Sequence, residues 1–271
     1  NTNVNALNAA SSLTSNQVTL NSTMQQLSTG LRINSAKDDA AGLAISTVMS
    51  SQIRGLSVAT RNANDGISMI QTVEGALNEI GNMLQRMREL GLQAANGTYS
   101  SADRTALGAE YTALKDEIQR ISDKTTWNGM ELAGSGAGSL QLQVGDAAGA
   151  SMTVTFVDVY DAASTIGSAA GMGITTTASA ANAVSAVDQA ISALDSYRSN
   201  LGAYINRLQY TTDNLTNVAT NISASRSRIL DADYAQTTTE LAKRQIIQQA
   251  ATAMLAQANQ EPAGVLSLLQ Q

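Results

Sequence analysis

The sequence predicts a mainly α-helical protein in which the N- and C-terminal halves form long antiparallel helical rods, or coiled coils, with a small β-containing central insert. Three observations lead to this prediction. The 271 residues include a single proline, so little interrupts a long helix. Aromatic residues make up only 3% of the chain, which favours thin paired helices over a large globular core. Apolar residues recur every three or four positions on both sides of a central stretch that lacks this period.

Residues 3–33 predict a helix with a weak apolar seam. The seam consists of Leu13, Leu20 and Leu27, which recur every seven residues, with Met24 and Leu31 in a second column. The surrounding side chains are mostly Asn, Gln, Ser and Thr, and almost none is charged. Such a helix buries only a narrow stripe and has little stability of its own. We therefore expect it to be disordered until a partner helix covers the seam.

Two stronger helices follow a polar break at residues 34–39. Within this break Ser35 is a candidate helix cap, and Asp38 three residues later completes an arrangement that resembles a capping box. Residues 40–95 then place large apolar side chains in steps of three and four. Residues 102–123 repeat this spacing, so both segments are predicted to be long helices with well-defined buried faces.

The central residues have a different character. Residues 134–138 are rich in glycine and predict a flexible linker. Apolar and polar residues then alternate on both sides of a glycine-containing turn, which predicts a β-hairpin at 139–159. Residues 161–182 have no clear period. This region is therefore a small insert and not part of the helical scaffold.

The C-terminal half carries the most regular pattern of the sequence, at residues 183–230. Its seam recurs every seven residues as Val187, Leu194, Leu201, Leu208, Leu215, Ile222 and Ile229. A last helix is predicted at 232–260. Its weaker seam consists of Ile247, Ala251, Met254 and Ala258. We expect Glu261 and Pro262 to interrupt this helix before an apolar tail that includes Leu268.

These patterns divide the chain into three predicted regions. Terminal coiled-coil segments occupy 1–33 and 231–271, and a helical rod domain occupies 34–133 and 184–230. The small surface insert with its β-hairpin occupies 134–183. Because strong seams flank the insert and weak seams lie at the termini, we expect the two halves to pair with the insert at one tip.

Composition limits the possible functions. The chain contains no His and no Cys, so the common catalytic triads and zinc sites cannot form. Its net charge of −6 argues against nucleic-acid binding, and no apolar run is long enough to cross a membrane. The first 30 residues lack the pattern of a cleaved secretory signal. We therefore expect no enzyme, no cofactor, no metal site, no nucleic-acid partner and no membrane insertion.

Two clusters of carboxylates have structural interpretations. Lys37, Asp38 and Asp39 are interpreted as electrostatic support for a helix start, because adjacent carboxylates on a helix point in different directions. Asp231 and Asp233 suggest a calcium site, but the spacing of an EF-hand loop is missing. Neither cluster predicts a metal site.

Several stretches together resemble bacterial flagellins. The matching stretches are LSTGLRINSAKDDAAG at 27–42, SVATRNANDGIS at 57–68, TVEGALNEI at 72–80, LQRMREL at 84–90, SRSRI at 225–229, DADYA at 231–235, LAQANQ at 255–260 and VLSLL at 265–269. The resemblance covers about 1–133 and 184–271, nearly without gaps. Two positions depart from the family pattern, since Gly91 replaces a usual alanine and Glu261 replaces an apolar or small residue.

The resemblance implies a structural subunit that self-assembles into the bacterial flagellar filament, which is extracellular. Such subunits are exported unfolded through the flagellar secretion channel, and their ends order on polymerisation. Their partners are copies of the same chain, an export chaperone, and hook–filament junction and cap proteins. The residues expected at the assembly interface are Leu13, Leu20, Leu27, Leu31, Ile247, Met254 and Leu268. Uncharged flanks favour pairing between subunits, and the alternative is a bundle closed within one chain.

A second implication concerns an innate immune receptor of the Toll type. Arg86, Leu90 and Glu110 lie in stretches that resemble the receptor-recognised region of some flagellins. Arg86 and Leu90 are one helical turn apart, so one face can present both. The alternative is that Leu90 belongs to the core and Arg86 is an ordinary surface charge.

Two other functions remain open from the sequence. One alternative is a cell-surface flagellin relative that acts as an adhesin, in which the Ser- and Thr-rich insert could bind a ligand or polysaccharide. It also shares its terminal patterns with junction and cap proteins of the same appendage. Those relatives seldom carry the whole rod pattern found here, which favours the filament subunit.

Overall fold

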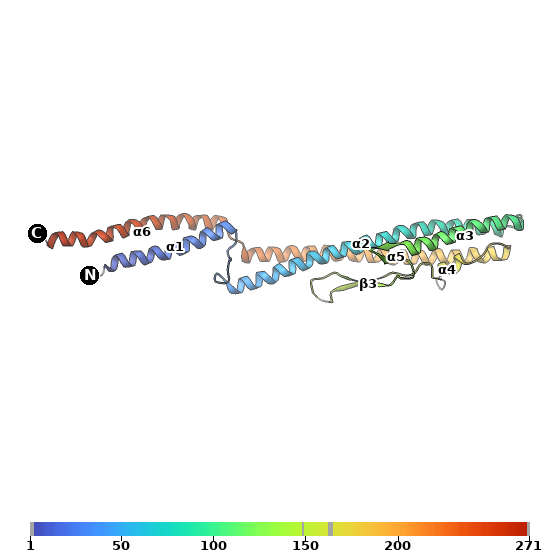
Figure 1. Cartoon of the computed structure of the whole chain (residues 1–271), viewed down its shortest axis with the longest axis horizontal. Helices are drawn as coiled ribbons and strands as arrows, with labels where there is room; N and C mark the ends of the chain where they lie inside the picture. Colours follow the sequence, from blue (N-terminus) through green and yellow to red (C-terminus); the bar gives the residue numbers. More distant parts are fainter. Residues whose placement is uncertain (1–2, 148, 162–164, 270–271) are drawn as a thin grey trace. The chain divides into compact units, whose positions relative to one another are not determined.

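The computed structural model describes residues 3–147, 149–161 and 165–269, with side chains as far as Gln260. Most of these residues are helical, which confirms the predicted fold class (Figure 1). The helices are α1 (Val4–Thr29), α2 (Ala40–Ala95), α3 (Ser101–Lys124), α4 (Thr165–Ala170), α5 (Thr177–Leu230) and α6 (Tyr234–Leu269). The strands are β1 (Thr126–Trp127), β2 (Met130–Glu131), β3 (Ser139–Gln143) and β4 (Ser151–Thr155).

The chain forms two compact units, which are described separately. One unit comprises residues 1–53 with 220–271, and the other comprises residues 54–219. Their limits fall inside α2 and α5, whereas the sequence placed domain boundaries at the loops that precede α2 and α6. The three predicted regions therefore stay a prediction. No helix within the described residues has both the length and the hydropathy that crossing a membrane requires.

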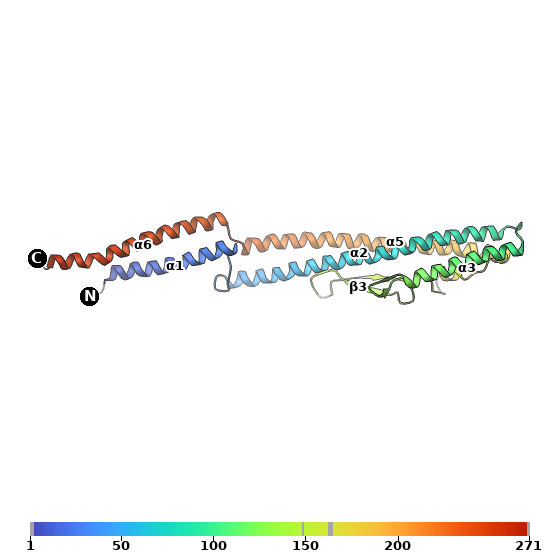
Figure 2. The same cartoon turned by 45° about the horizontal axis from the view of Figure 1, so that its top comes forward.

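The unit of residues 54–219 is built on the paired seams of α2 and α5, which run side by side (Figure 2). Both predicted seams are confirmed as buried within this unit, whereas Ile222 and Ile229 of the predicted α5 seam belong to the other unit and are only half-buried. On α2 the fully buried residues are Ile70, Val73, Leu77, Ile80, Leu84, Met87 and Leu90, and on α5 they include Val187, Leu201 and Leu208. Helix α3 adds buried Tyr111 and Ile118 to the same core. The apolar spacing in the sequence thus identified this core correctly.

Helix α3 has well-defined ends. It begins with a capping box in which the Ser100 hydroxyl accepts from the Asp103 N–H, and the Asp103 carboxylate accepts from the Ser100 N–H. After α3, the short strands β1 and β2 pair across Asn128 and Gly129. Both turn residues have positive φ, of 48° and 79°, as a two-residue hairpin turn with the matching twist requires.

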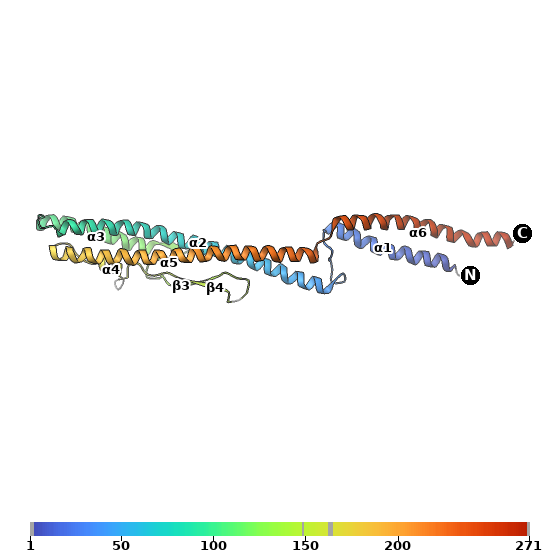
Figure 3. The ribbon, with the colours of Figure 1, turned by 180° about the vertical axis from the view of Figure 1, so that it is seen from behind.

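The predicted hairpin of the insert is confirmed, with strands that end at Thr155 (Figure 3). It lies along α2 and not at a tip, because Asn62 Nδ2 donates to the Gln143 carbonyl over 2.9 Å. Gly66 permits this packing, since an added Cβ would lie 2.4 Å from Leu142 Cδ1. The expectation of an insert at one tip is therefore wrong for the hairpin, whose apolar face needs a helix to cover it.

The end of α1 and the cap of α2 differ from the sequence prediction. Helix α1 ends at Thr29, because Gly30 adopts φ 71° and its N–H closes the last turn on the Gln26 carbonyl. Ser35 does not cap α2. Instead, the Asp39 carboxylate accepts from the Gly42 N–H over 2.9 Å, since Asp39 is the residue directly before the helix.

The remaining differences concern the last two helices and the insert. Helix α5 begins six residues earlier than predicted, at Thr177, and a short helix α4 lies within the stretch that showed no period. Helix α6 passes through Pro262 and ends at Leu269, so the predicted interruption is wrong. The ring of a proline removes one hydrogen bond but does not force a helix to end when other contacts support it.

Candidate assembly surface

Within the unit of residues 1–53 and 220–271, α1 and α6 lie side by side and run antiparallel (Figures 1 and 3). A short bridge joins the ends at which the two helices meet. Leu31 pairs with Asp231, the Arg32 N–H donates to the Leu230 carbonyl over 2.7 Å, and the Ala232 N–H donates to Gly30. This bridge holds the beginning of α6 beside the end of α1.

The seam of α1 faces α6, as its leucine spacing predicted. Leu20 is only 6% exposed, and Leu13 and Leu27 are half-buried. Two polar residues are buried as deeply as the leucine, since Asn16 is 4% exposed and Thr23 is 5% exposed. The sequence analysis did not identify Asn16 and Thr23, although both fall at heptad-type spacing from Leu20. The face that α1 turns to its partner is therefore half polar.

The seam of α6 was predicted correctly at Ala251 and Ala258, but at the other two positions it lies one residue later than predicted. Ile247 and Met254 are 38% and 65% exposed, so they do not face α1. The residues that do face it, stepping by four and three from Thr237, are Leu241, Arg244, Gln248, Ala251, Leu255 and Ala258. Apolar character misled the prediction at Ile247, because the helical period places the polar Gln248 inward. It does not explain the choice of Met254, since Leu255 is no less apolar. The side chain of Leu268 lies outside the described residues.

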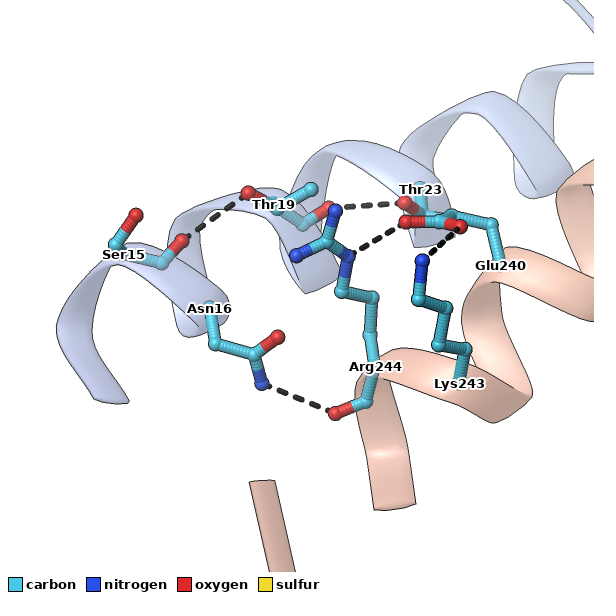
Figure 4. A network of polar contacts seen from close by, with 7 residues as sticks. All are labelled: Ser15, Asn16, Thr19, Thr23, Glu240, Lys243 and Arg244. Atoms are coloured by element: carbon cyan, nitrogen blue, oxygen red, sulfur yellow. Dashed lines mark hydrogen bonds and ion pairs between the residues drawn. The ribbon is translucent and has the colours of Figure 1, made fainter. Parts of the chain in front are cut away.

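Polar contacts connect the two seams (Figure 4). Between the helices, the Asn16 amide donates to the Arg244 carbonyl over 3.0 Å. Within α6, the Arg244 guanidinium donates to Glu240 over 2.7 Å. Gln248 Nε2 donates to Gln17 Oε1 over 2.7 Å. Such bonds specify how two helices align but stabilise them less than apolar burial does. The α1–α6 pair is therefore well specified and weakly stabilised.

Both helices leave large apolar side chains uncovered. On α1 these are Val4, Leu7, Val18 and Met24, and on α6 they are Ile246, Ile247 and Met254. Val4, Leu7 and Val18 share one side of α1 by their spacing. Apolar side chains grouped on an exposed helix face are typical of a surface that another protein covers. These residues are referred to below as the uncovered apolar residues.

The acidic residues near this surface have local structural roles. Asp38 accepts from the Asn34 N–H and from the hydroxyl and N–H of Ser35, and these hydrogen bonds lower its pKa. Asp231 accepts from the Ser227 hydroxyl, and Asp233 accepts from the Ala235 N–H at the start of α6. Within the described residues, no group of three or more His, Cys, Asp or Glu side chains is placed to hold a metal ion.

The three residues predicted for receptor contact are only partly brought together at the surface. Arg86 and Glu110 are exposed and joined by an ion pair of 2.8 Å, and Glu89 also pairs with Arg86. The hydrogen bonds that the Arg86 guanidinium donates to Glu89 and Glu110 raise the pKa of Arg86. Leu90 is fully buried, which contradicts its presentation at the surface and supports the alternative of a core residue. Arg86 and Glu110 alone remain candidates for such a contact.

Comparisons with known families match both halves of the chain. The model of the bacterial flagellin N-terminal helical region matches residues 1–136, and that of the C-terminal helical region matches residues 184–269. The insert between them falls outside both models. This division follows the strong helical patterns of the sequence.

Individual proteins match over nearly the whole chain. A flagellin of Halalkalibacterium halodurans is 45% identical, over 99% of this chain and 98% of that protein. Polar flagellin F of Vibrio parahaemolyticus is 38% identical, over 99% and 98%. The crystal structure of Bacillus cereus flagellin aligns with a TM-score of 0.51 and 35% identity, covering 61% of this chain and 94% of that one.

These matches identify a structural protein and do not favour the surface adhesin. They also agree with the helical rods and the small β insert described above. The chain belongs to the bacterial flagellin family and is a non-enzymatic structural subunit of the extracellular flagellar filament.

Proposed function

We propose that α1 and α6 form the contacts through which this subunit polymerises. The two helices order fully only when neighbouring subunits bury the uncovered apolar residues. The observation that carries the proposal is the exposure of Ile246 and Met254, which are 66% and 65% exposed on a helix whose inward face is half polar. Burying such side chains against neighbouring copies stabilises the helices, so their order depends on subunit concentration.

The same weakness suits export in an unfolded state. A pair held by a few hydrogen bonds and little apolar area has a small free energy of unfolding, and no disulfide could lock it because the chain has no cysteine. We propose that an export chaperone covers the uncovered apolar residues before secretion, and that hook–filament junction and cap proteins meet the same helices afterwards.

Deletion of residues 1–40 and 232–271 tests the assembly role. The remaining chain is expected to be a soluble, helical monomer that does not polymerise, because the α2, α3 and α5 core lies within it. Circular dichroism measures its helix content, sedimentation its size, and electron microscopy any filaments. Filaments formed by this shortened chain would contradict the proposal.

A point variant with a matched control separates assembly from folding. Ile246→Ser replaces one uncovered apolar residue and is expected to raise the concentration needed for polymerisation without lowering monomer stability. Val58→Ser removes another exposed apolar side chain, from α2, where we place no assembly contact. Equal effects of both variants on polymerisation would count against a specific role of α6.

The receptor proposal rests on the Arg86–Glu110 pair alone. Its guanidinium and carboxylate lie 2.8 Å apart on the exposed faces of α2 and α3, where a polar partner can reach both. We expect Arg86→Ala with Glu110→Ala to weaken binding of a Toll-type receptor ectodomain to the monomer. Exposed Arg120→Ala with Glu117→Ala is the matched control. If the Arg86→Ala, Glu110→Ala double variant bound the receptor ectodomain as tightly as the unmodified chain, the proposed receptor contact would be ruled out.

A further inference from the structure

The carbonyl of Ala258 loses its usual helical partner because of the residue four positions later. In an α-helix this carbonyl accepts from the N–H of residue 262, and proline has no N–H. Helix α6 nevertheless continues past this point to Leu269. Another group must therefore donate a hydrogen bond to this carbonyl, because otherwise the Ala258 carbonyl in the α1–α6 seam would lack a hydrogen-bond donor.

The structure supplies that donor from the other end of the chain. Asn3 Nδ2 donates to the Ala258 carbonyl over 2.6 Å. The other side of the same amide also has a partner, because Asn3 Oδ1 accepts from the Ala6 N–H over 3.1 Å and caps the start of α1. One side chain thus completes both α1 and α6.

The contact agrees with the alignment of the whole helix pair. Nearer the middle, Asn16 donates to the Arg244 carbonyl, and at the joined end the Tyr234 hydroxyl donates to the Leu27 carbonyl over 3.2 Å. As the residue number increases along α1, the number of its partner on α6 decreases, as a single antiparallel register requires. The Asn3 contact is therefore the outermost bond of a consistent series.

We propose that Asn3 is a positioning residue that replaces the hydrogen bond lost at Pro262, and so couples the first turn of α1 to the integrity of α6 around its proline. The coupling has a direction that can be measured. It exists only while residue 262 cannot donate, so restoring that N–H makes the Asn3 donor dispensable.

The test uses a cycle of Asn3→Asp and Pro262→Ala in the full chain. Aspartate keeps the acceptor that caps α1 but has no N–H for Ala258, so it removes one bond of the two. Amide hydrogen exchange in filaments is measured for peptides that cover residues 250–261. With Pro262 present, Asn3→Asp is expected to speed exchange roughly tenfold, as loss of a hydrogen bond of about 1.4 kcal/mol implies. With Pro262→Ala, the same change is expected to have less than about a twofold effect.

Asn16→Ala is the matched control, because its acceptor carbonyl at Arg244 already has a helical partner in the N–H of Gln248. Its effect should be the same with and without Pro262→Ala. Equal effects of Asn3→Asp on both backgrounds, or no effect with Pro262 present, would overturn the proposal.

The measurement depends on the proposed polymerisation, but the two can fail separately. Electron microscopy scores filament formation independently of exchange. A variant that does not polymerise alone is measured as a minor, ¹⁵N-labelled component of filaments of the unmodified chain. If the unmodified chain itself forms no filaments, the proposed function fails, and the same cycle is measured on the soluble chain.

Discussion

The α2–α5 pair buries mainly apolar side chains, whereas the α1–α6 pair buries apolar and polar side chains together. In the first pair, residues such as Leu84 and Leu201 are fully buried and meet an apolar face. In the second, Leu20 shares the seam with buried Asn16, and much of the contact is made by hydrogen bonds. Apolar burial supplies most of the free energy of folding, whereas hydrogen bonds mainly select one arrangement. The comparison teaches that stability and specificity are divided between two regions of one chain.

The largest expected effect comes from truncating a core leucine in each pair. Leu84→Ala should lower the free energy of unfolding by about 3 kcal/mol, because a fully buried leucine leaves a cavity. Leu20→Ala should leave the main denaturant transition unchanged, because the α1–α6 pair contributes little to it. Denaturation followed by circular dichroism compares both with exposed Leu92→Ala. If Leu84→Ala and Leu20→Ala lowered the free energy of unfolding equally, the two helix pairs would not differ in their contribution to stability.

In the unit of residues 54–219, Tyr111 is expected to contribute a pH effect of up to about 2.7 kcal/mol, the value implied by two pKa units. Burial raises the pKa of Tyr111 from 10.0 to about 12. Below pH 10 the hydroxyl is protonated in both states, so its full contribution to stability is present. As pH rises from 10 to 12 the unfolded chain ionises first, and stability falls.

Tyr111→Phe separates this titration from other effects of alkali. The variant loses the hydrogen bond from the Tyr111 hydroxyl to the Ala169 carbonyl, so it starts less stable at pH 7. Its stability should then fall less steeply above pH 10 than that of the unmodified chain. Parallel curves for the two proteins would show that Tyr111 is not the titrating group.

A smaller effect, of about 1 kcal/mol, is expected at Gly91. Alanine is normally the better helix former by about this amount. Here an added Cβ would lie 2.8 Å from Val184 Cγ2, so Gly91→Ala should destabilise the α2–α5 pair. Adding Val184→Ala makes room, and the double variant should recover the loss. A stabilising Gly91→Ala would show that Val184 moves aside freely.

The smallest effect is expected at the surface ion pairs. Arg86 pairs with Glu89 and Glu110, and the raised pKa of Arg86 reflects both. Because these groups are exposed, water and salt screen the attraction, and Arg86→Ala should barely change the melting temperature. Calorimetry at low and high salt checks this. A large decrease in the melting temperature of Arg86→Ala would show that surface ion pairs contribute substantially to stability, contrary to this expectation.

The sequence predicted the α2–α5 core well because large apolar residues mark it at every turn. Its prediction failed where polar side chains face inward. On α6, Ile247 was chosen over Gln248, since apolar character was the only available signal and the partner helix was unknown. The bond between Asn3 and Ala258 joins the two ends of the chain, and no local pattern indicates such a contact. Gly91 could be recognised as unusual, but its reason lies in Val184 on another helix.

The uncharged character of the α1–α6 contacts has a consequence for the surroundings in which a filament works. Amide groups of Asn3 and Asn16 bind main-chain carbonyls, and such dipolar bonds respond little to dissolved ions. If ion pairs between carboxylates and amines aligned the two helices, the strength of that alignment would differ between fresh water and brine, because salt screens ion pairs. We therefore expect the alignment of α1 and α6 by amides to stay nearly constant across that range of salinity.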